Sequence, residues 1–188
     1  MKSTFHSKVL VAAATLALAA GAVSAQDISK FVIYDAAAKK TLMKNEINAD
    51  TARKIIDKCI DIATKANMAI TIFILSPTGQ IVASHRMDGQ VPINIDTALL
   101  KAKSVLETRD STHLRANMIA TNIPQQIKWH DIGVFTTAGG LPIVAGGQMI
   151  GTIGIGGGNK DEEMAFEALE AVVGPQPALA PTQPPPAR

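Results

Sequence analysis

The sequence predicts a single α/β domain with a mainly antiparallel sheet. Three observations predict this class: a helical apolar stripe over residues 52–66, an apolar strand pair around the turn 76–79, and a second pair around Gly146-Gly147. Each short turn joins two strands as a hairpin, and hairpins place antiparallel strands side by side. Hydrophobic residues make up 47% of the 188-residue chain and charged residues 18%, which is a globular balance.

The first 25 residues have the segment order of a secretory signal peptide. Lys2 and Lys8 precede an apolar run over residues 9–20, and Val23-Ser24-Ala25 supplies the small residues of a cleavage site. The run is shorter than the roughly 20 residues that a membrane span needs, so a permanent anchor is the less favoured alternative. We therefore expect cleavage before Gln26, a periplasmic or secreted protein, and no stable membrane insertion.

The composition argues against nucleic-acid partners. Without Lys2 and Lys8 the chain has 16 basic and 16 acidic residues, so it carries no net charge that would attract a polyphosphate. Aromatic residues make up only 4%, which leaves few faces on which bases can stack.

The mature chain is predicted to begin with an N-terminal extension, residues 26–46, which has a weak helical signal over 27–45. Polar capping residues then precede the amphipathic helix, whose apolar residues recur at spacings of three and four. Cys59, the single cysteine, lies on the apolar side of this helix. We expect it to be buried and unreactive, because free cysteines are among the most buried residues.

The centre of the chain predicts a β-hairpin followed by helices. The run 69–75 is apolar and rich in β-branched residues, as a central strand covered on both faces would be. Pro77 and Gly79 supply the turn. The remaining predicted elements are a return strand at 81–87, helices at 96–108 and 112–119, a loop at 121–131 that contains Pro124, and a short strand at 134–137.

The last part of the predicted domain is rich in glycine, and a proline-rich tail follows it. Residues 139–158 hold nine of the 14 glycines, and apolar runs at 141–145 and 148–155 flank the Gly-Gly turn. Asn159 and Glu162 have the spacing of a capping box at the start of a helix that ends at Gly174. Six of the 14 residues from 175 to 188 are proline, which predicts a disordered tail. The domain is therefore expected over residues 47–174.

Few side chains have the spacing of a known catalytic or metal site. The three histidines of the mature chain lack zinc-binding spacing, the absence of Cys-x-x-Cys-His excludes covalent haem, and no Gly-x-Ser-x-Gly marks a serine hydrolase. Arg86 and Lys101 can form a two-cation clamp if the strand end meets the helix, although each can also be a solvated charge. Gly139 and Gly140 serve tight packing or let a flat ligand approach the backbone.

Four segments have a family-like combination of motifs and spacing: Met87-Asp88-Gly89, Lys101-Ala102, Gly139-Gly140-Leu141-Pro142-Ile143 and 147–155. Together they resemble the GlcG/HbpS family, which also occurs as the C-terminal domain of PduO-type cobalamin adenosyltransferases. The resemblance covers residues 47–174, and it implies an α/β/α layered, profilin-like domain that forms homo-oligomers. Some members of the family bind haem.

The resemblance also implies the site residues. Arg86, Met87, Asp88 and Lys101 occupy matching family positions, and Thr112 stands where the family often has a threonine linked to haem contact. His113 is a second candidate for the iron. The chain departs from the family at Leu75-Ser76 and at residues 155–157, where a polar side chain is lost each time.

Three functional hypotheses remain open on the sequence. The leading one is non-covalent binding of haem or a related tetrapyrrole, with Arg86 and Lys101 at the propionates and Thr112 or His113 near the iron. The second is an enzyme or binder for a small organic carboxylate, with Asp88 as acid or base. The third is an assembly module without a ligand. A binding protein is favoured over an enzyme.

Overall fold

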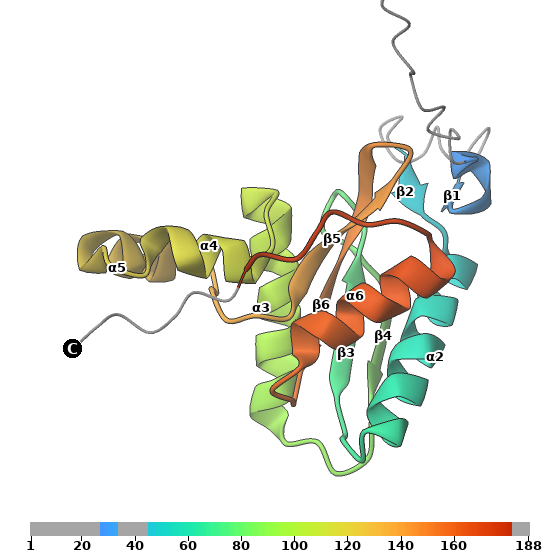
Figure 1. Cartoon of the computed structure of the whole chain (residues 1–188), viewed down its shortest axis with the longest axis horizontal. Helices are drawn as coiled ribbons and strands as arrows, with labels where there is room; N and C mark the ends of the chain where they lie inside the picture. Colours follow the sequence, from blue (N-terminus) through green and yellow to red (C-terminus); the bar gives the residue numbers. More distant parts are fainter. Residues whose placement is uncertain (1–26, 34–44, 182–188) are drawn as a thin grey trace, which may run out of the picture.

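The computed structural model describes residues 27–33 and 45–181 (Figure 1). The predicted signal peptide, residues 34–44 of the N-terminal extension and residues 182–188 of the tail lie outside the described residues. Within the described ranges, no helix is both long enough and apolar enough to cross a bilayer.

The predicted fold class is confirmed, since a four-stranded antiparallel sheet lies between layers of helices (Figure 1). The strand order is β4-β3-β6-β5, so β4 and β5 are the edges. The strands are β3 (Thr71–Leu75), β4 (Ile81–Arg86), β5 (Gly140–Ala145) and β6 (Gln148–Gly156). A small second sheet pairs β1 (Val32–Ile33), which follows the short helix η1 (Ile28–Lys30), with β2 (Glu46–Ile47).

Two helices cover one face of the main sheet and enclose the larger core. These are α2 (Ala49–Lys65), capped by Asn48 as its polar start predicts, and α6 (Asp161–Val172). Cys59 on α2 is completely buried, as predicted, and burial raises the pKa of its thiol to about 12. A thiol that stays protonated and is closed to solvent is unreactive.

The third layer is α3 (Pro92–Thr108), which packs across the other face of the sheet against β6. The close packing of α3 against β6 explains part of the glycine content of this strand. A Cβ at Gly154 would lie 2.0 Å from the carbonyl oxygen of Ala98, so only glycine fits there. The helix begins four residues before the predicted position 96, because Pro92 stands in its first turn, where its missing N–H costs nothing.

Two short helices follow α3 and project from the domain as an arm (Figure 1). Helix α4 (Thr112–Ile119) was predicted, whereas α5 (Ile123–Asp131) replaces the predicted loop at 121–131. Pro124 lies in the first turn of α5, and Asn122 caps the helix by accepting from the N–H of Gln125. The predicted strand at 134–137 is also wrong: the N–H of Phe135 bonds to the Ser104 hydroxyl on α3 rather than to a strand.

The predicted capping box before α6 does not form either. The N-cap residue is Lys160, without a side-chain cap, and Asp161 Oδ1 accepts instead from the N–H of Gly158 at 2.8 Å. The carboxylates of Asp161 and Glu162 thus turn into the protein, where they reach partners on α3 and α4.

Candidate functional site

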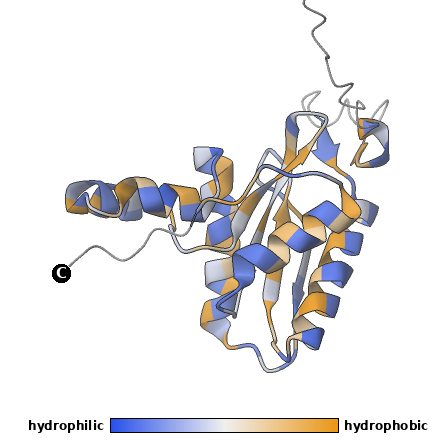
Figure 2. Cartoon of the chain, viewed as in Figure 1, coloured by the Kyte–Doolittle hydropathy of each residue, from blue (hydrophilic) through white to orange (hydrophobic). Residues whose placement is uncertain are grey.

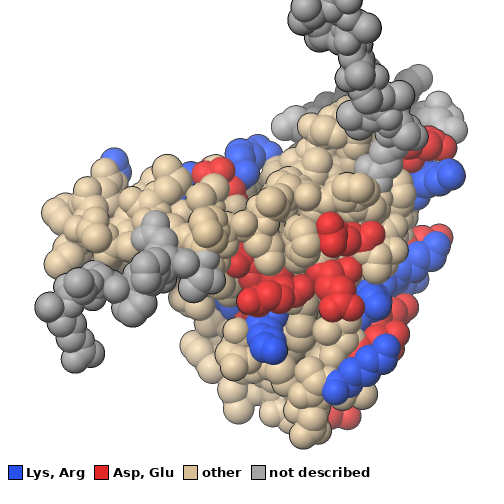
Figure 3. Space-filling view, viewed as in Figure 1, with Lys and Arg blue, Asp and Glu red and all other residues tan. Residues whose placement is uncertain are grey.

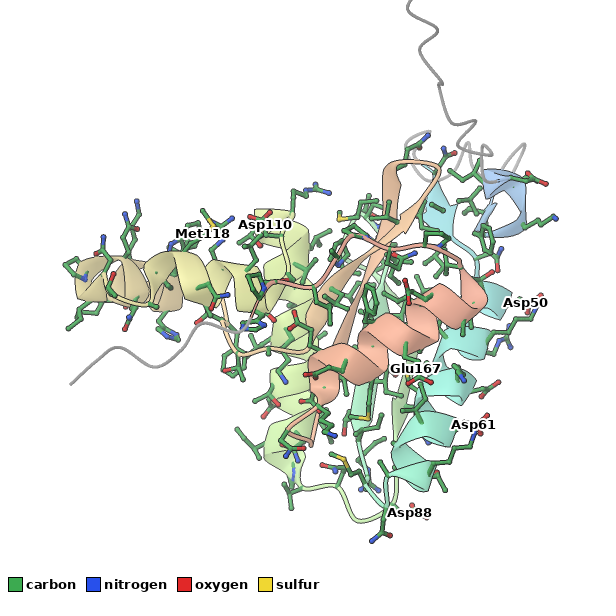
Figure 4. All side chains as sticks on the ribbon, in the orientation of Figure 1. Asp50, Asp61, Asp88, Asp110, Met118 and Glu167 are labelled. Carbon is green, nitrogen blue, oxygen red and sulfur yellow. The ribbon has the colours of Figure 1, made fainter. Side chains whose placement is uncertain are left out.

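Arg86, Met87 and Asp88 share no hydrogen bond or ion pair with the other predicted site residues in the described part of the chain. Arg86 is exposed, and its Nη1 donates to the carbonyl oxygen of Gln90 at 3.0 Å. Met87 packs against the larger core. Asp88 lies at the lower end of the domain in Figure 4, far from Asp110 near the start of the arm. This segment is therefore a solvated strand end rather than part of a shared pocket.

Lys101 faces the interior and not a ligand. It is 3% exposed, and its Nζ donates to Asp161 Oδ2 and to the carbonyl oxygen of Ile155, both at 2.7 Å. Burial raises the pKa of Asp161, and the ammonium of Lys101 opposes that effect. The proposed clamp with Arg86 does not form, because the two cations have different partners. Nor does Lys101 snorkel to the solvent.

Gly139, Gly140 and Thr112 lie beside this ion pair in a packed region. A Cβ at Gly139 would lie 2.7 Å from the Asp161 Cβ and 2.9 Å from Lys101 Nζ. The Thr112 hydroxyl donates to the carbonyl oxygen of Thr137 at 2.7 Å and accepts from the N–H of Gly140 at 3.0 Å. The two glycines thus admit protein side chains, which agrees with the tight-packing alternative of the sequence analysis.

His113 forms a second acid–base pair at the start of α6, and it differs from the first in its exposure. Its Nδ1 lies 2.8 Å from Glu162 Oε2, and the two side chains are 19% and 5% exposed. Burial raises the pKa of Glu162, while the hydrogen bond with His113 opposes the rise. The Ser111 side chain also lowers the pKa of Glu162 by hydrogen bonding, although Glu162 Oε1 is buried and has no partner at full hydrogen-bond geometry among the described residues. The ring nitrogen Nε2 of His113 makes no hydrogen bond within the described part of the chain.

A groove of about 490 Å³, which we call the tail groove, lies next to this second pair. Ser111 and Leu114, on either side of His113 in sequence, line it, and so does Phe166, one helical turn beyond Glu162. His113 itself does not. The remaining walls are mostly apolar and come from Leu141, Pro142, Val144, Met149, Leu169 and the tail residues Gln176, Pro177, Ala178, Leu179, Ala180 and Pro181.

Arg109 supplies positive charge to the tail groove. It is the only cation among the described residues that line the groove, and it forms no ion pair with a described carboxylate. Its Nη1 lies 3.9 Å from Met149 Sδ, and its backbone is left-handed (φ 62°) at the end of α3. The neighbouring Asp110 pairs instead with Arg115, whose guanidinium also stacks on Trp129.

Asp110 also lines the groove, so the lining holds one charge of each sign. Acidic side chains gather over α6 on the face seen in Figure 3, and Glu163, Glu167 and Glu170 of this helix are exposed. No cluster of three or more described His, Cys, Asp or Glu residues is arranged to hold a bare metal ion.

Sequence reasoning missed the tail groove and Arg109. Part of the wall comes from the segment predicted to be disordered: residues 175–181 run back from α6 along β5 to the arm (Figure 1). The only sequence signal was Arg109 itself, a cation at a helix end beside apolar strands, and nothing in the sequence placed it against the tail.

The fold and the groove together define an α/β/α domain with an apolar ligand-sized hollow and a carboxylate-held histidine beside it. A family model described as haem degrading protein HbpS-like matches residues 47–170. The chain therefore belongs to the HbpS-like family, and the predicted resemblance is confirmed. No curated protein matches the chain by sequence.

Solved structures agree with this assignment. A double mutant of Streptomyces reticuli HbpS has a TM-score of 0.62 at 27% identity, over 70% of this chain and 89% of that one. Klebsiella pneumoniae protein ORFY gives 0.63 at 24%, over 69% and 92%. PduOC, crystallised as a complex with haem, gives 0.62 at 19%, over 68% and 95%. The last two identities are low, so these two likenesses show the fold alone.

Proposed function

We propose that this protein is an exported, HbpS-like binding protein that holds haem or a related tetrapyrrole non-covalently between the tail groove and the adjoining His113, which lies beside the groove and not in its wall. The observation that carries the proposal is the His113–Glu162 pair beside an apolar groove of about 490 Å³. Small-molecule sites commonly enclose about 300–1,000 Å³ and are lined mainly by apolar side chains. The haem complex of PduOC, a protein of the same fold, adds support.

The residues of the groove fit the two chemical halves of haem. Apolar side chains such as Leu114, Leu141 and Phe166 offer a surface for the macrocycle, and the guanidinium of Arg109 offers hydrogen bonds to a propionate. Lys101 and Thr112, which the resemblance linked to the ligand, are engaged within the protein and are not assigned to it here.

His113 is the residue that we assign to the iron. A metal-binding histidine usually donates its second ring N–H to a carboxylate, which fixes the ring and its tautomer. Glu162 holds Nδ1 in this way, so Nε2 is the nitrogen left for a metal. Bound iron would supply the ligand's redox and gas-binding chemistry, and this chain's part is to orient the imidazole and exclude water from the apolar walls.

A hemin titration followed by the Soret band tests the proposal. We expect wild type to bind, and we expect Arg109→Ala to bind about three- to tenfold more weakly, because an exposed charged hydrogen bond is lost. Arg53→Ala is the matched control, since Arg53 is an exposed arginine on α2 that pairs with Asp50. Wild type that binds hemin no better than a protein-free blank would refute the proposal.

A smaller apolar carboxylate is the second candidate ligand. The unpaired Arg109 in an apolar groove favours it as much as it favours a propionate. Asp88 lies outside the groove lining, so no acid or base role at this site falls to it. A small organic acid that competes with hemin and depends on Arg109 would support shared use of the groove.

Export and assembly complete the proposal. We propose cleavage before Gln26 and a periplasmic or secreted protein, which mass spectrometry of protein from the native host would test: retention of Met1 would contradict it. We also propose a homo-oligomer, because hydrophobic residues occur along the projecting arm (Figure 2) and several of them are exposed. Among them are Met118, Ile123 and Ile127, each more than half exposed. A monomer in light scattering at micromolar concentration would contradict the oligomer.

A further inference from the structure

Strand β5 is an edge of the sheet, and one residue of the tail bonds to both backbone groups of Val144 on this strand. The N–H of Val144 donates to Gln176 Oε1, and the carbonyl oxygen of Val144 accepts from Gln176 Nε2, both at 3.0 Å. A single side-chain amide therefore takes the place that one residue of a further strand would occupy. Gln176 Nε2 also donates to the carbonyl oxygen of Gly174 at 2.9 Å, which fixes the turn after α6.

Two further contacts hold the tail beyond Gln176. Leu179 packs against the larger core, and the carbonyl oxygen of Pro181 accepts from Asn117 Nδ2 on α4 at 2.9 Å. The tail thus crosses from the edge strand to the arm, and the residues between these anchors line the groove. We call residues 175–181 the strap.

The sequence of the strap explains why a side chain holds it. Pro175, Pro177 and Pro181 have no N–H, so the strap cannot form a regular ladder with β5. Proline also restricts the backbone before any ligand arrives, which lowers the entropy that the strap loses when it closes a site. The strap is therefore stiff along its length but attached to the sheet edge mainly through Gln176.

We propose that the strap is the outer wall of the ligand site and that Gln176 is the residue that positions it. The groove exists with the strap in place, so a ligand can lie between the strap on one side and β5, α4 and α6 on the other. The ligand class is a flat or elongated apolar molecule with an acidic group that reaches Arg109. The haem identity of that ligand rests on the proposed function, whereas the role of the strap does not.

The proposal predicts a faster dissociation of ligand when Gln176, whose side-chain amide is engaged with β5, is removed. Gln176→Ala releases the strap from β5, so bound ligand should leave about three- to tenfold faster and bind correspondingly more weakly. The control is Gln125→Ala, the same exchange at an exposed position of α5. The probes are hemin and 8-anilinonaphthalene-1-sulfonate, an apolar anion without iron, each measured with the full chain.

Amide hydrogen exchange at Val144 directly reports whether the strap is attached to β5. If the strap is a wall, either probe should slow exchange of the Val144 N–H in wild type, and Gln176→Ala should abolish this slowing. Faster exchange at Val144 on binding would mean that the ligand displaces the strap, and it would overturn the proposal. Affinities that Gln176→Ala leaves unchanged would also overturn it.

The two probes separate this proposal from the haem proposal. If the sulfonate binds with the expected dependence on Gln176 and hemin does not bind, the proposed role of the strap is supported and the proposal that the ligand is haem is refuted. If hemin binds with no dependence on Gln176, the haem identity stands and the strap fails. If neither probe binds, both proposals fail.

Discussion

Two acid–base pairs lie side by side at the start of α6, and they differ in whether a polar atom is left without a hydrogen-bond partner. Lys101 and Asp161 are 3% and 5% exposed, and Asp161 has a partner at each oxygen: Lys101 at Oδ2 and the N–H of Gly158 at Oδ1. His113 is 19% exposed, and its Nε2 makes no hydrogen bond among the described residues.

From this difference we propose that the first pair supports the fold and that the second serves a ligand. A buried ammonium and carboxylate that satisfy each other have no group left to offer. An imidazole held at one nitrogen by a carboxylate still has its other nitrogen. The family resemblance implied Lys101 and Thr112 as ligand residues, and His113 was a further candidate from the sequence. Our proposal keeps His113 and adds Arg109, because Lys101 and Thr112 bond within the protein.

The largest expected effect follows removal of the lysine of the first pair. Lys101→Met leaves the Asp161 carboxylate buried without its cation, and breaking a buried pair from one side costs about 3–5 kcal/mol. Denaturant unfolding measures this free energy. Lys103→Met, an exposed lysine on the same helix, should cost little by comparison.

The same variant also tests the separation of the two pairs. We expect the fraction of Lys101→Met that stays folded to bind hemin as wild type does. Unchanged stability combined with lost hemin binding would place Lys101 in the ligand site and contradict the comparison.

A smaller loss is expected at Thr112. Thr112→Val keeps the shape of the side chain but removes the hydroxyl that bonds to Thr137 and Gly140, so two backbone groups lose a partner. Each unsatisfied buried group costs about 1–3 kcal/mol. We expect a lower thermal midpoint and unchanged hemin affinity; a variant that is as stable as wild type but fails to bind hemin would restore Thr112 as a ligand contact.

The smallest effect concerns pH and the second pair. Burial raises the pKa of Glu162 in the folded protein above its value in the unfolded chain, so the folded state holds this proton more tightly. The stability that this proton confers is complete below the unfolded pKa and is lost as the pH rises through the folded pKa. Glu162→Gln should lack the part of the decline in the free energy of unfolding that comes from this proton. Urea unfolding across the acidic range would show the difference. An identical pH profile in both proteins would mean that Glu162 is not perturbed.

The sequence predicted the layers of the fold because those layers depend on local periodicity. The apolar stripe of α2, the run of β3 and the Gly-Gly turn between β5 and β6 all appear where they were expected. The α5 helix was missed for a local reason as well, since Pro124 was interpreted as a breaker and lies instead in the first turn.

The site was harder to predict because its contacts join distant residues. Lys101 is buried by Asp161, 60 positions later, and no local pattern distinguishes this from a lysine that awaits a ligand. Gln176 looks like a polar residue in a disordered proline-rich tail until β5 is known to be an edge strand. From the sequence, part of the proposed site was predicted only through His113 and through the family resemblance.

The absorption spectrum of the hemin complex of His113→Ala, with and without added imidazole, tests the central claim most directly. If Nε2 of His113 binds the iron, wild type shows a Soret band typical of histidine ligation, the variant loses it, and imidazole in solution restores it. His130→Ala, a histidine on α5 outside the groove lining, should keep the wild-type spectrum. A His113→Ala complex with the wild-type spectrum in the absence of imidazole would show that the iron is bound elsewhere, and it would contradict the assignment of the second pair to the ligand.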